Sequence, residues 1–208
     1  MIELYAFATP NSVKVLIALE ELSLPYMLNS VDLRQGAQNT PTFLALNPNG
    51  KVPVIVEELA DGTRFSLSES AAILVYLAEK TGQLLPAASP ARERVFEQLF
   101  FHASSLAPTF SNLAHFTRSS AGSDPAALHR FRTETERILN RLDTLLAMRS
   151  YVSGDDFSIA DIAHFGWFWR RDFIGVDISG LPNLSRWCAT LEQKPSIQRA
   201  ITRLAGAP

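Results

Sequence analysis

Hydrophobic and polar positions over the first eighty residues follow two alternating periods. A β-branched and aromatic run at Ile2–Phe7 predicts a strand. Apolar positions then recur at helical spacing over 13–24, which predicts a helix whose other face carries Lys14, Glu20 and Glu21. The same patterns predict, in order, a strand at 26–33, a short helix at 41–46, strands at 52–56 and 64–67, and a helix at 69–79. This β-α-β-α-β-β-α order indicates a compact α/β domain with a mixed sheet.

Beyond residue 82 only helical periodicity remains. The Pro-rich stretch at 86–90 is typical of a connector between domains. Long helices are expected at 90–118 and 125–149, divided at 119–124, with further helices from 158, near 182–193 and over 195–203. Ser158 and Asp161 match a capping box at one of these starts. We therefore expect an α/β domain at 1–82, a linker at 83–89 and an all-α domain at 90–208.

Composition and charge narrow the class of protein. The 208 residues carry 19 Lys and Arg against 21 Asp and Glu, and a formal net charge of −2 argues against electrostatic binding of nucleic acid. The single cysteine, Cys188, permits no internal disulfide. The four histidines show no metal-ligand spacing, so no metal site is expected. No leader-like start and no long apolar run is present, which favours a cytoplasmic protein without a membrane span.

The first candidate site lies where the first strand leads into a helix. Thr9, Asn11 and Ser12 add short hydrogen-bonding side chains at this helix start, where unpaired amides and the helix dipole favour an anion. No acidic or histidine side chain is near in sequence to act as a base, so the turn is suited to stabilising an anion. The alternative is that Thr9 and Asn11 only shape the turn and cap the helix.

The second candidate is Lys51-Val52-Pro53, just before a strand. If the bond before Pro53 is cis, Val52 turns its backbone N–H and C=O outward, ready to pair with an extended peptide. The alternative is a trans proline that begins an edge strand.

The third candidate is Glu69-Ser70, again at a helix start. Ser70 and the first-turn amides suit a carboxylate, and Glu69 suits an ammonium, so together they suit the head group of an α-amino acid. Capping by Ser68 is the simpler interpretation of this segment, but it leaves Glu69 and Ser70 without a role.

In this order and spacing, the three motifs resemble the cytosolic glutathione transferase family. The resemblance covers nearly the whole chain and implies a thioredoxin-like first domain, an all-helical second domain, glutathione as co-substrate, and a homodimer. Lys51-Val52-Pro53 is similar to the family's cis-proline motif, and Glu69-Ser70 is similar to its γ-glutamyl-binding pair. The segment from Ser158 to Asp161 is similar to the family's N-capping box.

The stretch TPNSVKV is most similar to the Nu class and to Ure2-like bacterial proteins. That resemblance implies that Thr9 and Asn11 stand beside the glutathione sulfur, with the Ser12 hydroxyl as an alternative contact. It also implies that Val52, next to Pro53, pairs with the cysteinyl backbone. The other implied contacts are Glu69 and Ser70 for the γ-glutamyl group, Gln38 and Lys51 for the glycine end, and Arg130 of the second domain for a carboxylate.

Asn11 stands where the cysteine-type classes of this family carry their cysteine. A mixed disulfide through that position is therefore excluded, and the reacting sulfur is expected to come from glutathione. The expected function is activation of glutathione as a thiolate, either for conjugation to small electrophiles or for reduction of a disulfide. The alternative is a transferase-like module that serves protein association or regulation without turnover, since a fold alone does not fix function.

Overall fold

The computed structural model describes residues 1–118 and 124–205, which form two compact units. Unit 1 comprises Met1–Gln83 together with the C-terminal segment from Gln193, and unit 2 comprises Leu84–Glu192. The first boundary lies beside the expected one at residue 82. The second differs from expectation, because the last helix joins unit 1 and not the helical domain predicted over 90–208.

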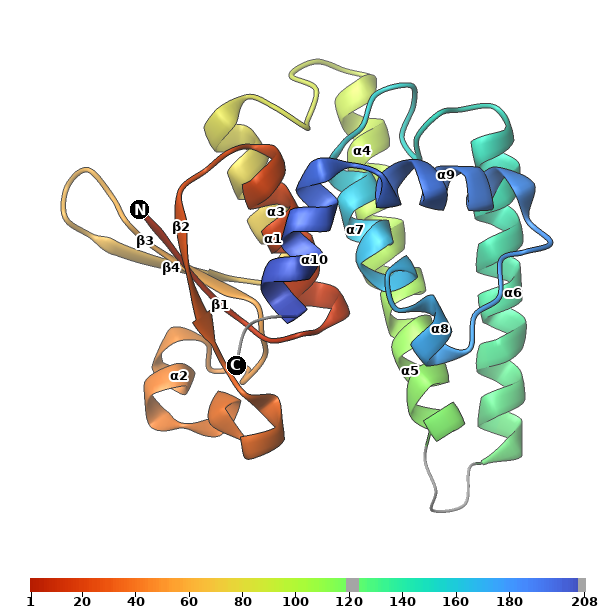
Figure 1. Ribbon diagram of the computed structural model, residues 1–208. Coiled ribbons are helices and arrows are strands. Elements are labelled where there is room, and N and C mark those ends of the chain that lie inside the picture. Colours follow the sequence, from red (N-terminus) through yellow and green to blue (C-terminus); the bar gives the residue numbers. More distant parts are fainter. Residues whose placement is uncertain (119–123, 206–208) are drawn as a thin grey trace. The chain divides into compact units, whose positions relative to one another are not determined.

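Unit 1 is built on a four-stranded mixed sheet of order β2-β1-β3-β4 (Figure 1). β1 is parallel to β2 and antiparallel to β3, and β3 is antiparallel to β4. The strands are β1 (Ile2–Ala6), β2 (Tyr26–Ser30), β3 (Val54–Glu58) and β4 (Arg64–Ser68). The mixed α/β fold predicted for this part of the chain is confirmed.

Helices cover both faces of this sheet. They are α1 (Pro10–Glu21), α2 (Pro41–Leu46), α3 (Ser70–Thr81) and α10 (Pro195–Ala205), with 3₁₀ turns at Leu33–Gln35 and Ala37–Asn39. Side chains of successive strand residues point to opposite faces. Tyr5 and Val54 are cross-strand partners that pack with Phe43 of α2. Their neighbours Leu4 and Ile55 are fully buried on the other face, which α1 and α3 cover.

Helix α1 is enclosed on all sides. Every residue from Ser12 to Glu20 is buried, because α1 lies between the sheet, α3 and α10. The polar face expected for this helix is therefore wrong at Lys14, whose exposed fraction is only 1%. The amphipathic pattern of α1 does not show that a helix from the other end of the chain covers it.

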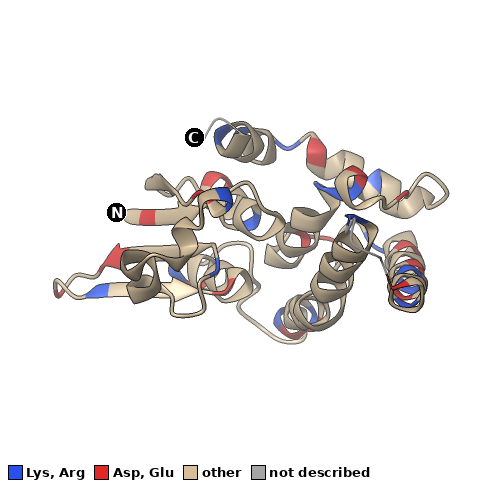
Figure 2. Cartoon of the chain, turned by 90° about the horizontal axis from the view of Figure 1, so that it is seen from below, with Lys and Arg blue, Asp and Glu red and all other residues tan. Residues whose placement is uncertain are grey.

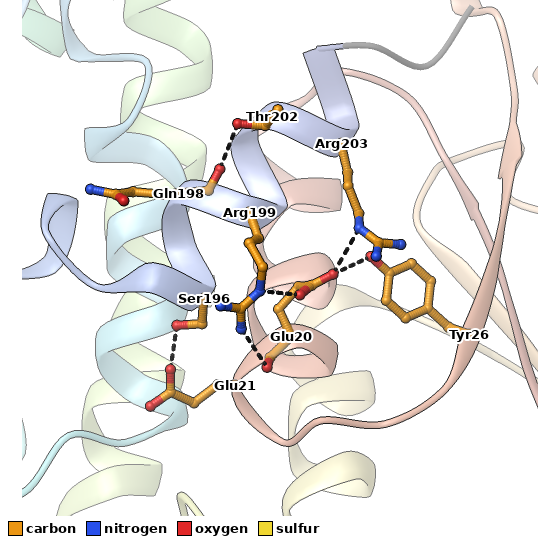
Figure 3. A network of polar contacts seen from close by, with 8 residues as sticks. All are labelled: Glu20, Glu21, Tyr26, Ser196, Gln198, Arg199, Thr202 and Arg203. Atoms are coloured by element: carbon orange, nitrogen blue, oxygen red, sulfur yellow. Dashed lines mark hydrogen bonds and ion pairs between the residues drawn. The ribbon is translucent and has the colours of Figure 1, made fainter.

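Glu20 links α1 to α10 through hydrogen bonds and ion pairs (Figure 3). Its carboxylate accepts hydrogen bonds from the Arg199 Nε at 2.7 Å and from the Tyr26 hydroxyl at 2.6 Å, and it pairs with Arg203 at 3.1 Å. The next residue, Glu21, accepts a hydrogen bond from Ser196 and pairs with a lysine at the helix start. These contacts tie the end of the chain to the helix that begins at Thr9.

Glu20 also makes the stability of unit 1 depend on pH. Burial alone raises the pKa of Glu20, but hydrogen bonds from Tyr26 and Arg199 and the arginine charges outweigh it, so the pKa lies below its usual value. A depressed folded-state pKa contributes stability that is present above the unfolded value, about 4.3, and that is lost as the pH falls through the folded value.

We therefore expect Glu20→Gln to lower the free energy of unfolding by about 1–2 kcal/mol at pH 7. The difference from wild type should shrink as the pH falls below the unfolded-state value, about 4.3, toward the lowered folded-state pKa of Glu20. Urea unfolding at pH 7 and below pH 4 measures this difference in the free energy of unfolding. Glu134→Gln, which breaks an exposed i,i+3 pair with Arg137, is the matched control and should change stability by less than about 0.5 kcal/mol. Equal losses in the two variants would contradict this role of Glu20.

Unit 2 is all-helical, as predicted. Its helices are α4 (Ala91–Phe101), α5 (Ala107–Arg118), α6 (Pro125–Ala147), α7 (Ile159–Phe168), α8 (Arg171–Ile174) and α9 (Pro182–Glu192). The single helix expected over 90–118 is interrupted by a π-helical segment at His102–Leu106. Pro108 follows it, and a proline cannot donate to the carbonyl four residues earlier, which accounts for the irregular turn. Most of the break expected at 119–124 lies outside the described residues.

The start of α7 is held by the predicted capping box. Ser158 Oγ accepts from the Ala160 amide at 3.2 Å, and Asp161 Oδ2 accepts from the Ser158 amide at 3.0 Å. Asp161 Oδ1 also accepts from the Val152 amide and from Trp187 Nε1, each at 2.9 Å. Asp161 is fully buried, so this carboxylate satisfies several donors within the core of unit 2.

Candidate functional site

The turn between β1 and α1 is held by its own hydroxyl groups. Thr9 is the N-cap of α1, and its Oγ1 accepts a hydrogen bond from the Ser12 amide at 3.1 Å. The Thr9 hydroxyl donates to Ser12 Oγ at 3.0 Å, and Ser12 Oγ also accepts from the Phe7 amide at 3.4 Å. Ser12 is fully buried. The structure thus gives both hydroxyls a part in shaping the turn, with Ser12 inside it.

Asn11 differs from Thr9 and Ser12 because its side chain is held by a lysine. Lys14 Nζ donates a hydrogen bond to Asn11 Oδ1 at 2.7 Å. An ammonium has only donors, so this contact requires the amide oxygen of Asn11 to face Lys14 and leaves the two N–H donors of its Nδ2 to face elsewhere. Burial lowers the pKa of Lys14 to about 7, against the opposing effect of the Glu69 charge. Asn11 is therefore a fixed donor at the start of a helix.

Lys14 also joins this turn to the start of α3. Its Nζ lies 3.5 Å from Ser70 Oγ, although the two residues are 56 positions apart in the sequence. Glu69, the N-cap of α3, has φ +66°, a left-handed conformation that costs a non-glycine residue about 1–3 kcal/mol. Its exposed side chain makes no capping bond. Ser68 is the last residue of β4, so the interpretation of Ser68 as the helix cap is wrong.

The Val52–Pro53 bond is cis, and the trans alternative is wrong. Within the described residues, Val52 forms no backbone hydrogen bond, so its N–H and C=O are available in the segment just before β3. The buried Asn47 holds the preceding turn, because its Nδ2 donates to the Lys51 carbonyl at 2.8 Å and its Oδ1 accepts from the Asn49 amide. The side chain of Val52 packs beside α2, in the cluster that Phe7 borders.

Gln38 lies against the same turn. Gly50 has φ +62°, and a Cβ at this position would stand 3.5 Å from the Gln38 carbonyl oxygen, so the two segments touch. Within the described residues, the buried Oε1 of Gln38 has no hydrogen-bond partner. Lys51 is exposed on the adjoining turn. A buried acceptor without a partner requires an explanation, such as a bound polar ligand.

The three sequence motifs thus border one region of unit 1, and two family models match this chain. The first, described as "Glutathione S-transferase, N-terminal domain", matches residues 8–80, and the second, "Glutathione S-transferase, C-terminal domain", matches residues 125–190. The chain belongs to the glutathione S-transferase family. This confirms the resemblance on which the sequence-based expectations rested.

Individual relatives of this transferase family member are similar over almost its whole length. The disulfide-bond oxidoreductase YfcG of Escherichia coli is 37% identical over 98% of this chain and 95% of its own. A glutathione transferase family member from Pseudomonas fluorescens, solved with two glutathione molecules bound, has a TM-score of 0.90 at 35% identity, covering 96% of this chain and 92% of that one. A glutathione transferase from Pseudomonas putida, solved with one glutathione disulfide per subunit, has a TM-score of 0.88 at 33% identity, covering 96% and 90%.

Arg130, the contact expected from the second domain of the transferase, lies on α6 in unit 2 and is exposed. Its part in the site stays a prediction. Acidic and basic residues are interspersed along the helices of each unit (Figure 2). Among residues 1–118 and 124–205, no cluster of three or more His, Cys, Asp or Glu suits a metal ion. No described helix is long and apolar enough to cross a bilayer.

Two residues of this region were not singled out by sequence reasoning. Lys14 was assigned to a polar helix face, and Asn47 was not considered. The signal for Lys14 was its position between Val13 and Val15, three residues after Asn11, within a nearly continuous apolar run. A lysine in such a run is expected to be buried, and a buried lysine needs a polar partner.

Proposed function

We propose that this transferase family member binds glutathione along the motifs of unit 1 and activates it as a thiolate for attack on a small electrophile or a disulfide. The observation that carries the proposal is the pair of contacts from Lys14, to Asn11 and to Ser70. They bring the turn proposed to hold the sulfur next to the residues proposed to hold the γ-glutamyl group.

Each part of the tripeptide then has a partner of suitable chemistry. The γ-glutamyl carboxylate is received by Ser70 and the first-turn amides of α3, and its ammonium by Glu69, whose side chain is not used for capping. The cysteinyl backbone pairs with the available N–H and C=O of Val52, which follows Lys51 and precedes Pro53. We assign the glycine end to Gln38 and Lys51, and a further carboxylate contact to Arg130.

Thiol activation at this site needs no general base. A free thiol has a pKa near 8.5, and lowering it by about two units takes roughly 2.7 kcal/mol of preferential thiolate stabilisation. The N-terminal end of a helix supplies about 0.3–2 kcal/mol, and a hydrogen bond to a charged group about 1.5–3 kcal/mol. The α1 dipole and the Asn11 amide therefore suffice, with Thr9 and Ser12 shaping the turn that presents them.

Both reactions balance with glutathione as the source of the sulfur. In conjugation the thiolate forms a carbon–sulfur bond and the electrophile loses its leaving group with the electron pair. In disulfide reduction the thiolate attacks one sulfur, the S–S bond breaks, and a second glutathione thiolate resolves the mixed disulfide. Two glutathione molecules are then oxidised for each disulfide reduced. Cys188 does not take part, because it is 2% exposed and burial raises the pKa of its thiol to about 12.

The assembly and location of the protein belong to the same proposal. We assign a homodimer, for which the exposed Phe100 on α4 and Met148 after α6 offer apolar surface. We place the protein in the cytoplasm, where reduced glutathione is plentiful and where a chain with one buried cysteine needs no oxidising compartment.

Removing the charge of Glu69 tests the γ-glutamyl assignment. We expect Glu69→Gln to raise the KM for glutathione about tenfold, with a smaller change in kcat, because a charge-assisted hydrogen bond to the ammonium is lost. Glu58→Gln, an exposed glutamate at the end of β3, is the matched control and should leave KM unchanged. Steady-state kinetics with varied glutathione measures the effect. An unchanged KM in Glu69→Gln would remove Glu69 from the site.

The proposed function as a whole is tested by retention on immobilised glutathione, followed by two assays. One is conjugation of a chlorinated nitrobenzene, and the other is glutathione-dependent reduction of a model disulfide. Retention with turnover in either assay supports the enzyme. Neither retention nor turnover would favour the alternative of a binding module that keeps the fold without the chemistry.

A further inference from the structure

Lys14 is the most unusual residue of unit 1, because it is a fully buried cation within an apolar helix. Burying an ammonium costs several kcal/mol unless partners compensate for its lost hydration. Among the contacts of Lys14 are Asn11 Oδ1 and Ser70 Oγ, which belong to the two halves of the proposed glutathione site. A methionine of similar length would fill the same space without this cost.

We propose that Lys14 is a positioning residue, which orients the Asn11 amide toward the glutathione sulfur and the Ser70 hydroxyl toward the γ-glutamyl carboxylate. This inference rests on the proposed function. When Lys14 is protonated it only donates, so both contacts then have a fixed direction. Asn11 must accept through Oδ1, so Nδ2 remains the donor for a thiolate. Ser70 must accept through Oγ, so its own proton remains available for a carboxylate.

The charges around Lys14 fit the same role. The first turns of α1 and α3 both lie beside it, and each presents the positive end of a helix dipole. The acidic group that acts on Lys14 is Glu69, and burial still lowers the pKa of the lysine to about 7. Of the other charged groups on the facing helices, Arg199 and Arg203 of α10 pair with Glu20, Lys80 of α3 pairs with Glu57, and Glu79 of α3 is exposed. A bound thiolate and carboxylate would add negative charge beside Lys14.

Lys14→Met therefore distinguishes an effect on the bound glutathione thiol from an effect on protein stability. Since the variant removes a buried charge, we expect its thermal midpoint without glutathione to equal or exceed that of wild type. We expect the pKa of the bound glutathione thiol to rise by about one unit, and kcat/KM at neutral pH to fall about tenfold. Lys80→Met, which breaks the Lys80–Glu57 pair at 2.9 Å outside the proposed site, is the matched control and should leave the thiol pKa unchanged.

The measurement is a pH titration of the ultraviolet thiolate absorbance of bound glutathione, together with thermal unfolding of the free protein. A raised thiol pKa in Lys14→Met but not in Lys80→Met supports the inference. A thiol pKa equal to that of wild type overturns it, whatever the thermal midpoint does. If Lys14→Met does not fold, Lys14→Gln is titrated in its place, because it also removes the charge. If wild type does not bind glutathione, the proposed function itself is overturned. If wild type binds glutathione and the thiol pKa is unaltered in Lys14→Met, only the role of Lys14 is overturned.

Discussion

An Asn11→Ala variant is expected to lose about 100-fold in kcat/KM, both for conjugation and for disulfide reduction. The reason is that the Lys14 contact engages Oδ1 of Asn11 and leaves its Nδ2 as the side-chain donor proposed for the sulfur. Removing one fixed donor from a developing or bound anion typically costs two orders of magnitude in rate. The hydroxyl of Thr9 does not replace it, because its proton is donated to Ser12. Steady-state kinetics with both substrate types measures the loss.

The control for Asn11→Ala is Asn140→Ala, on the exposed side of α6, where the amide donates only to the helix carbonyl of Glu136. This variant should keep wild-type kinetics. Unchanged glutathione affinity and unchanged turnover of both substrate types in Asn11→Ala would remove Asn11 from the sulfur site. The chemistry would then have to be reassigned to the hydroxyls of the turn.

Asp161→Ala is expected to lower the free energy of unfolding by about 3–5 kcal/mol. The Asp161 carboxylate accepts hydrogen bonds from the amides of Val152 and Ser158, from the Ser158 hydroxyl and from Trp187 Nε1. All these groups lie in the core, so alanine leaves buried donors without an acceptor and opens a cavity beside them. Denaturant unfolding of the full chain gives the size of the loss.

The matched control is Asp156→Ala, because Asp156 is exposed in the loop that leads to α7. Surface substitutions of this kind usually change stability by less than about 0.5 kcal/mol. A loss below about 1 kcal/mol in Asp161→Ala would mean that these hydrogen bonds contribute little to the stability of unit 2. The Asp161→Ala result bears on the fold alone, since Asp161 is in unit 2 and the proposed glutathione contacts are, apart from Arg130, in unit 1.

The elements of both units could be predicted because their signals are local. Strand and helix periods, the proline at 41 and the capping box at 158 each depend on a few neighbouring residues. The order of these elements was enough to indicate a mixed sheet followed by helices. The π-helical segment before Pro108 was missed, because the apolar pattern continues through it and only the missing amide of the proline marks the place.

The placement of α10 was missed for a different reason. Its strongly amphipathic pattern predicts a helix that covers an apolar surface, but it does not say which one. The deciding contacts join Glu20 to Arg199 and Arg203 across about 180 residues of sequence, and no local pattern reports them. The helix was therefore assigned to the wrong unit.

The candidate site was predictable to the extent that the family resemblance covered it. Thr9, Asn11, Val52 and Ser70 lie in motifs that a reader can recognise, and the structure shows how they are held. Lys14 lies outside those motifs. The role proposed for it depends on its burial and on a contact with Ser70, which are properties of the packed unit and not of the residues beside it in sequence.

The central claim is that unit 1 binds glutathione and stabilises it as a thiolate. The most direct test is a pH titration of the ultraviolet thiolate absorbance of glutathione bound to the wild-type protein. We predict an apparent pKa of about 6.5, roughly two units below that of a free thiol. An apparent pKa that stays at about 8.5 with glutathione bound would contradict the claim, because the turn at Thr9–Ser12 would then bind the sulfur without activating it.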